Sequence, residues 1–247
     1  MDKKEGQKII DKYFRKDINA DVYGNINEEK LNKIIQNIGN FEEPDMLSIF
    51  DNTIIGIELF EFDSSDNIKK GSKYQIANAM VKKKFDKIVE SDLKSKKNIT
   101  CHDDIKVKTC LSNYYKNFNK HYKSHYEKVD KYIEHIQQVI DCNNKNTEMW
   151  FFIEDTSILG SYYLNMKRDV IPLNPLYYHE NLELLKKSTK INGVIIGFFD
   201  MSRYRICVIE NSKAGIENFK KDIPEIKEED YFAFEPHTIG FATLLDK

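Results

Sequence analysis

The sequence predicts a single α/β domain over residues 1–247, built on a mixed β-sheet flanked by helices. The first observation is a stretch at residues 43–63 in which two β-rich apolar runs flank a short polar turn, as in a hairpin. The second is a pair of apolar runs, at 148–155 and 193–199, that have the length of buried strands. A helical pattern lies between these two strands, so their order implies a right-handed parallel crossover.

Two amphipathic patterns precede the hairpin and predict helices at residues 4–16 and 27–38. Asn27 has the side chain of a good N-cap for the second helix. Glu28 and Glu29 follow it, where the helix dipole favours acidic residues. We expect them to be ordinary first-turn acids; the alternative is that one of them approaches a metal ion bound at the hairpin.

Further helices are predicted at residues 72–93, where Ser72 can act as the cap, and along a three- and four-residue repeat of apolar side chains from Tyr115 to Ile140. The polar stretch 94–109 between them predicts a loop. The basic helical segment at about 70–142 is expected to be an insertion or lobe on the domain. The remaining elements are a helix at 178–190, a strand at 204–210 that pairs with the strand at 193–199, and a helix at 213–221.

The hairpin contains the one pattern in the chain that suggests chemistry. Because side chains alternate along a strand, Glu58 shares one side with Phe60 and Phe62. An ionised carboxylate on an apolar face is costly unless a cation or a metal ion compensates it. Asp45 follows Pro44 near the start of the first strand and supplies a second carboxylate.

Pro44-Asp45, the hairpin and then Gly56-Ile57-Glu58 resemble the metal-binding motif of the PD-(D/E)XK nuclease superfamily, which has the restriction-endonuclease-like fold. The resemblance covers about twenty residues. It implies that Asp45 and Glu58 bind Mg²⁺ or Mn²⁺ and that the protein is a metal-dependent endonuclease acting on DNA or RNA. The expected fold is then a restriction-endonuclease-like mixed sheet with a basic helical insertion.

The sequence departs from the motif at one position. A lysine two residues after the acid helps to activate the attacking water in that superfamily, and Phe60 stands there in this chain. Lys73, or failing it Lys70 or Lys69, is expected to replace it from the neighbouring helix. We therefore predict Asp45, Glu58 and Lys73 as catalytic residues. Glu154 and Asp155 at the end of a later strand would add to this site if their strand lies beside the hairpin.

The charge of the chain is unevenly distributed. Residues 69–135 contain 17 lysines and 8 acidic residues, whereas the whole chain has a net charge of −2. A basic segment can bind a polyanion because neutralising phosphates releases counterions. Lysines on a solvated helical face are the alternative. The residues predicted to contact nucleic acid are Lys69, Lys70, Lys82, Lys83, Lys84, Lys87, Lys116, Lys120 and Lys123.

Cysteine spacing argues against zinc. Cys101 and Cys110 could be combined with His121 and His125, but the eight residues between the cysteines exceed the usual two to four. The four scattered cysteines predict reduced thiols rather than a disulfide framework.

Several classes of protein are disfavoured. The chain lacks a long apolar run, a dinucleotide-binding glycine fingerprint, a nucleophile elbow and a His-Glu-x-x-His pattern. We expect a cytoplasmic protein without a membrane segment, and leave a homodimer open. Abundant Lys, Ile and Asn are typical of AT-rich bacterial or mobile-element genes. A role in bacterial defence or in a mobile element stays open. The alternative to a nuclease is a non-catalytic module that binds nucleic acid or protein and derives from a nuclease fold.

Overall fold

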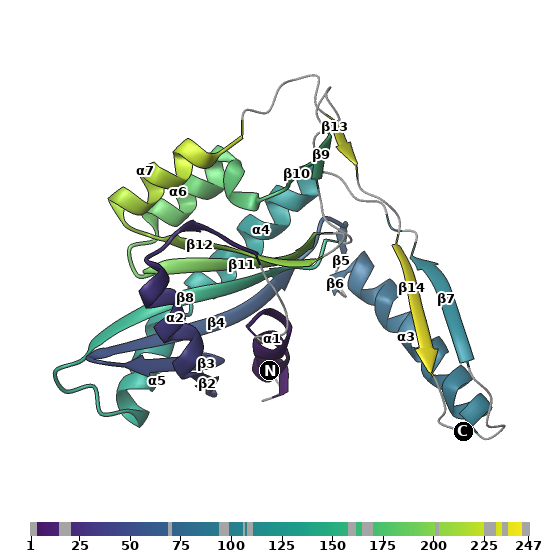
Figure 1. Cartoon of the computed structure of the whole chain (residues 1–247), viewed down its shortest axis with the longest axis horizontal. Coiled ribbons are helices and arrows are strands. Elements are labelled where there is room, and N and C mark those ends of the chain that lie inside the picture. The colour runs from purple at the N-terminus through teal and green to yellow at the C-terminus, as the bar shows by residue number, and fades with distance from the viewer. Residues whose placement is uncertain are drawn as a thin grey trace.

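A seven-stranded mixed sheet forms the centre of the protein (Figure 1). The computed structural model describes residues 4–14, 21–68, 71–93, 99–105, 107, 111–157, 162–164, 170–200, 203–224, 231–233 and 237–243. The strand order is β1-β12-β11-β8-β4-β3-β2. The strands of this sheet are β1 Asp21–Asn25, β2 Ile38–Asn40, β3 Met46–Phe50, β4 Thr53–Phe62, β8 Asn146–Asp155, β11 Gly193–Asp200 and β12 Arg203–Glu210.

The three central strands, β4, β8 and β11, run parallel to one another, and β3 and β12 run antiparallel on either side of them. Parallel strands need helical crossovers that cover both faces of the sheet, which explains why the central strands are apolar along nearly their whole length. The predicted α/β class, with a mixed sheet flanked by helices, is confirmed. The helices are α1 Lys4–Tyr13, α2 Glu28–Asn37, α3 Lys73–Leu93, α4 Leu111–Tyr126, α5 Val129–Val139, α6 His179–Lys187, α7 Lys213–Asp222 and the short 3₁₀ helix η1 Pro175–Tyr177.

Two hydrophobic cores lie on opposite faces of this sheet. On one face, α4, α5, α6 and α7 bury a large core that includes Phe118, Ile136 and Phe219. On the other face, α1 and α2 cover a smaller core with Tyr13 and Ile34. The alternation along β4 follows these two cores: even-numbered residues from Ile54 to Phe62 face the first, and odd-numbered residues face the second.

The hairpin of β3 and β4 forms as predicted. Asp51 has a positive φ of 49°, a conformation that Asp and Asn tolerate in tight turns. The predicted caps are also confirmed: the Asn27 side chain accepts hydrogen bonds from the backbone at the start of α2, and Ser72 Oγ accepts one from Gln75 N at the start of α3.

Two predictions about local structure were wrong, and one strand was missed. Residues 99–105, expected as loop, form strand β7, which pairs with β14 (His237–Thr243). The helix expected from Tyr115 to Ile140 is broken into α4 and α5 at Glu127 and Lys128. Strand β1 was not predicted at all. It joins the edge of the sheet beside β12.

The segment expected as a basic lobe, residues 70–142, divides into two parts. Helices α4 and α5 pack directly on β4 and contribute to the main core. Helix α3 instead extends away from the sheet together with β7 and β14, as the right-hand part of Figure 1 shows. The remaining short strands are β5 Asn67–Ile68, β6 Gly71–Ser72, β9 Tyr162–Leu164, β10 Val170–Pro172 and β13 Tyr231–Ala233.

Gly56 allows α5 to approach β4 closely. A Cβ atom at this position would lie 2.7 Å from Ile136 Cδ1 and 2.7 Å from Met149 Sδ. We expect Gly56→Ala to lower the free energy of unfolding by about 1–3 kcal/mol, the usual cost of overpacking a core. Chemical denaturation provides the measurement. Gly39→Ala is the matched control because a Cβ there meets nothing within 4 Å, and a cost for Gly56→Ala no greater than that of the control would contradict the close packing.

Candidate functional site

Asp45 and Glu58 lie next to each other, as the motif predicted. Asp45 immediately precedes β3, and its Oδ2 accepts a hydrogen bond of 2.8 Å from the backbone N–H of Leu59. This bond holds the Asp45 carboxyl against β4, within hydrogen-bonding reach of Glu58. The two residues therefore form an acid pair across the two strands of the hairpin.

Protein side chains, rather than a cation from the α3 segment, surround Glu58. Its Oε1 accepts a hydrogen bond of 2.6 Å from the Tyr132 hydroxyl and lies 2.8 Å from His125 Nδ1. His125 also stacks on the ring of Phe60, with the ring centroids 4.4 Å apart. Glu58 is only 7% exposed. Helices α4 and α5 thus cover the carboxylate and satisfy one of its oxygens.

Burial and the neighbouring carboxylate change the acidity of Asp45. Burial, and next the negative charge of Glu58, raise the pKa of Asp45 to about 6. Burial and the hydrogen bond to Glu58 raise the pKa of the Tyr132 hydroxyl well above its usual value, so that hydroxyl remains a donor. The Asp45 carboxyl therefore keeps its proton to a higher pH than an exposed aspartate does.

The predicted catalytic lysine does not join the pair. Lys73 Nζ forms an ion pair of 2.8 Å with Asp66 Oδ2 at the start of α3. Lys69 and Lys70 lie outside the described residues. Within the ranges that the structure describes, no lysine forms an ion pair with Asp45 or Glu58, so the catalytic role predicted for Lys73 lacks support in the geometry.

The residues at the acid pair do not fit a magnesium site as they are arranged. In the described part of the chain, no group of three or more His, Cys, Asp or Glu side chains is placed to hold a metal ion. Glu58 Oε1 and Asp45 Oδ2 already accept hydrogen bonds from the protein. Glu28 and Glu29 are exposed first-turn acids, and Glu29 pairs with Lys33 at 3.1 Å.

The described residues give no support to a zinc site built from Cys101, Cys110, His121 and His125. His125 contacts Glu58, and burial lowers the pKa of His121. Cys110 lies outside the described residues, as does the side chain of Cys101.

A second group of acids lies at the carboxyl ends of β4 and β8. Strand β8 is the parallel neighbour of β4, and Glu61 is in register with Glu154. A cavity of about 640 Å³ opens there, between these strand ends, α1 and the start of α3. We call it the crevice; it is lined by Lys12, Glu61, Gln75, Glu154, Asp155 and Ser157, among other residues.

Within the crevice, Glu154 forms an ion pair with Lys12 and accepts a hydrogen bond of 3.0 Å from the Tyr13 hydroxyl. Asp155 is buried and accepts a hydrogen bond of 2.8 Å from the Tyr114 hydroxyl. Burial raises the pKa of Asp155 to about 7. Glu154 points to the face opposite Glu58, so this acid does not complete the Asp45 and Glu58 pair.

The predicted nucleic-acid-binding lysines fall into two groups. Lys116, Lys120 and Lys123 lie along one side of α4 and line a cavity of about 520 Å³. We call this cavity the α4 groove. Its other wall comes from the start of α6, where Tyr178 stacks on Tyr115 with the ring centroids 4.5 Å apart.

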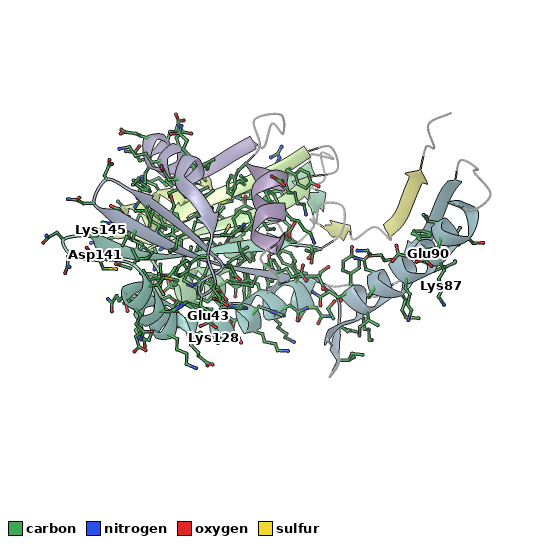
Figure 2. The ribbon with its side chains drawn as sticks, turned by 90° about the horizontal axis from the view of Figure 1, so that it is seen from below. Glu43, Lys87, Glu90, Lys128, Asp141 and Lys145 are labelled. Carbon is green, nitrogen blue, oxygen red and sulfur yellow. The ribbon has the colours of Figure 1, made fainter. Side chains whose placement is uncertain are left out.

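The other group lies on α3. Lys82 lines the crevice, and Lys83, Lys84 and Lys87 are exposed along the helix. Figure 2 shows Lys87 on the extended part of the molecule, far from Lys128, which precedes α5, and from the body of the sheet. The lysines therefore do not form one surface continuous with Glu58. Sequence reasoning missed Tyr178, since only the fold brings it to α4.

Searches of protein-family models, curated proteins and solved structures found no match to this chain. None of the helices in the described ranges has both the length and the apolar composition needed to cross a bilayer.

The acid pair makes stability depend on pH. Folding raises the pKa of Asp45 from its ordinary value of 3.8 to about 6, so between these pH values the folded state binds a proton that the unfolded chain has lost. We therefore expect Asp45 to contribute a decrease in the free energy of unfolding as pH rises from about 4 to about 6, in addition to the decrease up to about pH 7 that buried Asp155 contributes. Asp45→Asn, which can still accept from Leu59, should flatten this decrease and raise the melting temperature at pH 8.

Thermal melts from pH 4 to pH 8 provide the measurement. Asp86→Asn, at an exposed position on α3, is the matched control and should leave the profile unchanged. An Asp45→Asn profile parallel to that of the unmodified protein would contradict the buried acid pair.

Proposed function

We propose that this protein binds single-stranded nucleic acid in the α4 groove and does not cleave it. The observation that carries the proposal is the combination of three lysines with a stacked pair of tyrosines along one cavity. Proteins that bind single strands without sequence preference use this combination: cations neutralise the backbone, and aromatic rings stack on bases.

The composition of α4 supports a polyanion as the ligand. The helix contains no acidic residue, and Lys116, Lys120 and Lys123 are all exposed. Their spacing of four and three residues places them on one side of the helix over a length of about 10 Å. The groove also includes Glu180, whose charge raises the pKa of Tyr178. The lysines outnumber this acid, so the groove is net positive.

Tyr178 supports single strands over duplex. It is 38% exposed and lines the groove, with its ring stacked on that of Tyr115. A base can stack on such a ring only when it is not already stacked inside a double helix. The ring therefore favours a ligand whose bases are accessible.

We also propose a restriction-endonuclease-like fold that has lost the nuclease site. The proposal rests on the resemblance of Pro44-Asp45 and Gly56-Ile57-Glu58 to the nuclease motif and on their meeting across one hairpin. Phe60 stands in place of the motif lysine and stacks on His125. The Tyr132 hydroxyl donates a hydrogen bond to the Glu58 carboxylate, which would otherwise be free to bind a metal ion. A metal-dependent nuclease is the second candidate function, favoured by the convergence of Asp45 and Glu58.

Fluorescence anisotropy with labelled 12-nucleotide single strands tests the groove. Each lysine–phosphate contact contributes about −0.7 to the slope of log affinity against log salt for single strands. Changing Lys116, Lys120 and Lys123 to Ala should therefore make that slope less steep by about 2. Tyr178→Ala should weaken binding by about 1–3 kcal/mol, whereas Tyr178→Phe should retain it.

The matched control changes Lys213, Lys220 and Lys221 on α7 to Ala, with the same loss of charge. A third variant, with Lys83, Lys84 and Lys87 changed to Ala, measures how much the lysines of α3 contribute to the affinity. Absence of binding to any single strand at 50 mM salt would end the proposal, and so would an equal effect of the α4 and α7 triple variants.

Calorimetry with Mn²⁺ separates the two candidate functions. We expect Glu58→Ala to leave any binding of Mn²⁺ unchanged, because His125 and Tyr132 already contact the Glu58 carboxylate. Glu43→Ala, at an exposed position just before Pro44, serves as the control. Micromolar binding of Mn²⁺ that is lost only in Glu58→Ala would favour the nuclease instead.

A further inference from the structure

The crevice at the carboxyl ends of β4 and β8 is unrelated to the α4 groove in its chemistry. In open α/β sheets, the space beyond the carboxyl ends of parallel strands is where ligands commonly bind. The crevice has about 640 Å³, enough for a small molecule, and the proposed nucleic-acid binding makes no use of it.

An ammonium group already lies in this crevice. Lys12 Nζ pairs with the Glu154 carboxylate and lies 5.2 Å from the ring centroid of Tyr204 and 5.4 Å from that of Tyr13. A carboxylate with two aromatic rings is a favourable environment for an organic cation, since the faces of the rings carry negative potential. The crevice therefore contains the elements of an ammonium site, held here by the protein's own lysine.

The rest of the crevice offers mainly hydrogen-bond acceptors. Glu61 contacts the side-chain amide of Gln75, and Asp155 accepts from the backbone N–H of Ser157 at 2.8 Å. Adjacent strands are about 4.8 Å apart, so Glu61 lies one strand spacing from Glu154. Lys82 is the other cation on the wall and is exposed.

Ser157 provides an independent observation. Its side chain lines the crevice and is only 5% exposed, yet its Oγ makes no hydrogen bond of ordinary geometry to any residue in the described ranges. It lies close enough to Asp155 to favour the ionised carboxylate, but not in a position that satisfies the hydroxyl. A buried hydroxyl without a partner is costly, and a ligand that donates hydrogen bonds would remove that cost.

We propose that the crevice binds a small organic polyamine. One ammonium group of the ligand lies beside Glu61 and donates to Ser157 Oγ, and a second competes with Lys12 for Glu154 and the rings of Tyr13 and Tyr204. The carboxylates and aromatic rings favour a cation over a neutral molecule. Because Glu61 and Glu154 lie on adjacent strands, a ligand with more than one amine can contact both.

Calorimetry of the full chain with spermidine tests this site. We expect one site per chain, binding weakened about tenfold by Glu61→Gln and about threefold by Ser157→Ala, and no heat from triethylene glycol, an uncharged chain of similar length. Glu90→Gln removes an exposed acid on α3, shown in Figure 2, and is the matched control with less than a twofold effect.

Lys12→Met gives a second, opposite test. It keeps a long apolar side chain at this position of α1 but removes the competing ammonium, so spermidine should bind more tightly by about three- to tenfold. Lys213→Met has the same change of net charge at a distant helix and should not reproduce the effect. Circular dichroism establishes that each variant is folded. The proposal is overturned if folded protein gives no heat with 10 mM spermidine, or if Glu61→Gln binds as tightly as the unmodified chain.

Discussion

The burial of one carboxylate, Glu58, constrains how the main face of the sheet is covered. A charged group under two helices requires donors at fixed positions, and these come from Tyr132 on α5 and His125 on α4. Gly56 is one strand repeat away and lets Ile136, one helical turn from Tyr132, contact the strand. The break between α4 and α5 places both donors over the same oxygen. His125 and Tyr132 are seven residues apart, so in one continuous helix they would lie about two turns apart along its axis.

Much of the fold could be predicted from the sequence because its signals are local. The hairpin, the central strands at 148–155 and 193–199, and the caps Asn27 and Ser72 depend on side-chain periodicity and on single residues near element ends. What the sequence could not provide were pairings between distant segments. Strand β7 has a polar sequence that becomes a strand only beside β14, and β1 needs the exposed edge of β12.

The candidate site shows the same division. The resemblance to the nuclease motif, placed on a hairpin, was sufficient to predict that Asp45 and Glu58 meet. The sequence could not indicate whether the compensating group would be a metal, a lysine or a hydroxyl, because Tyr132 and His125 come from helices 67 or more residues further along the chain. Side chains alternate between the two faces along β4, so two acids only three residues apart lie in different sites. Glu58 is buried in the acid pair under α4 and α5, whereas Glu61 lines the open crevice.

The pairing of β7 with β14 has a consequence for how the chain folds. Ile105 is opposite His237, so a strand made early has its partner only in a segment made much later. Pairings of such large sequence separation form slowly, because a long loop must close before any bond is gained. During synthesis, β7 therefore leaves the ribosome with an unpaired edge, at which it can pair with other chains. Chaperone binding to nascent chains should concentrate on this interval of translation, after Ile105 and before His237.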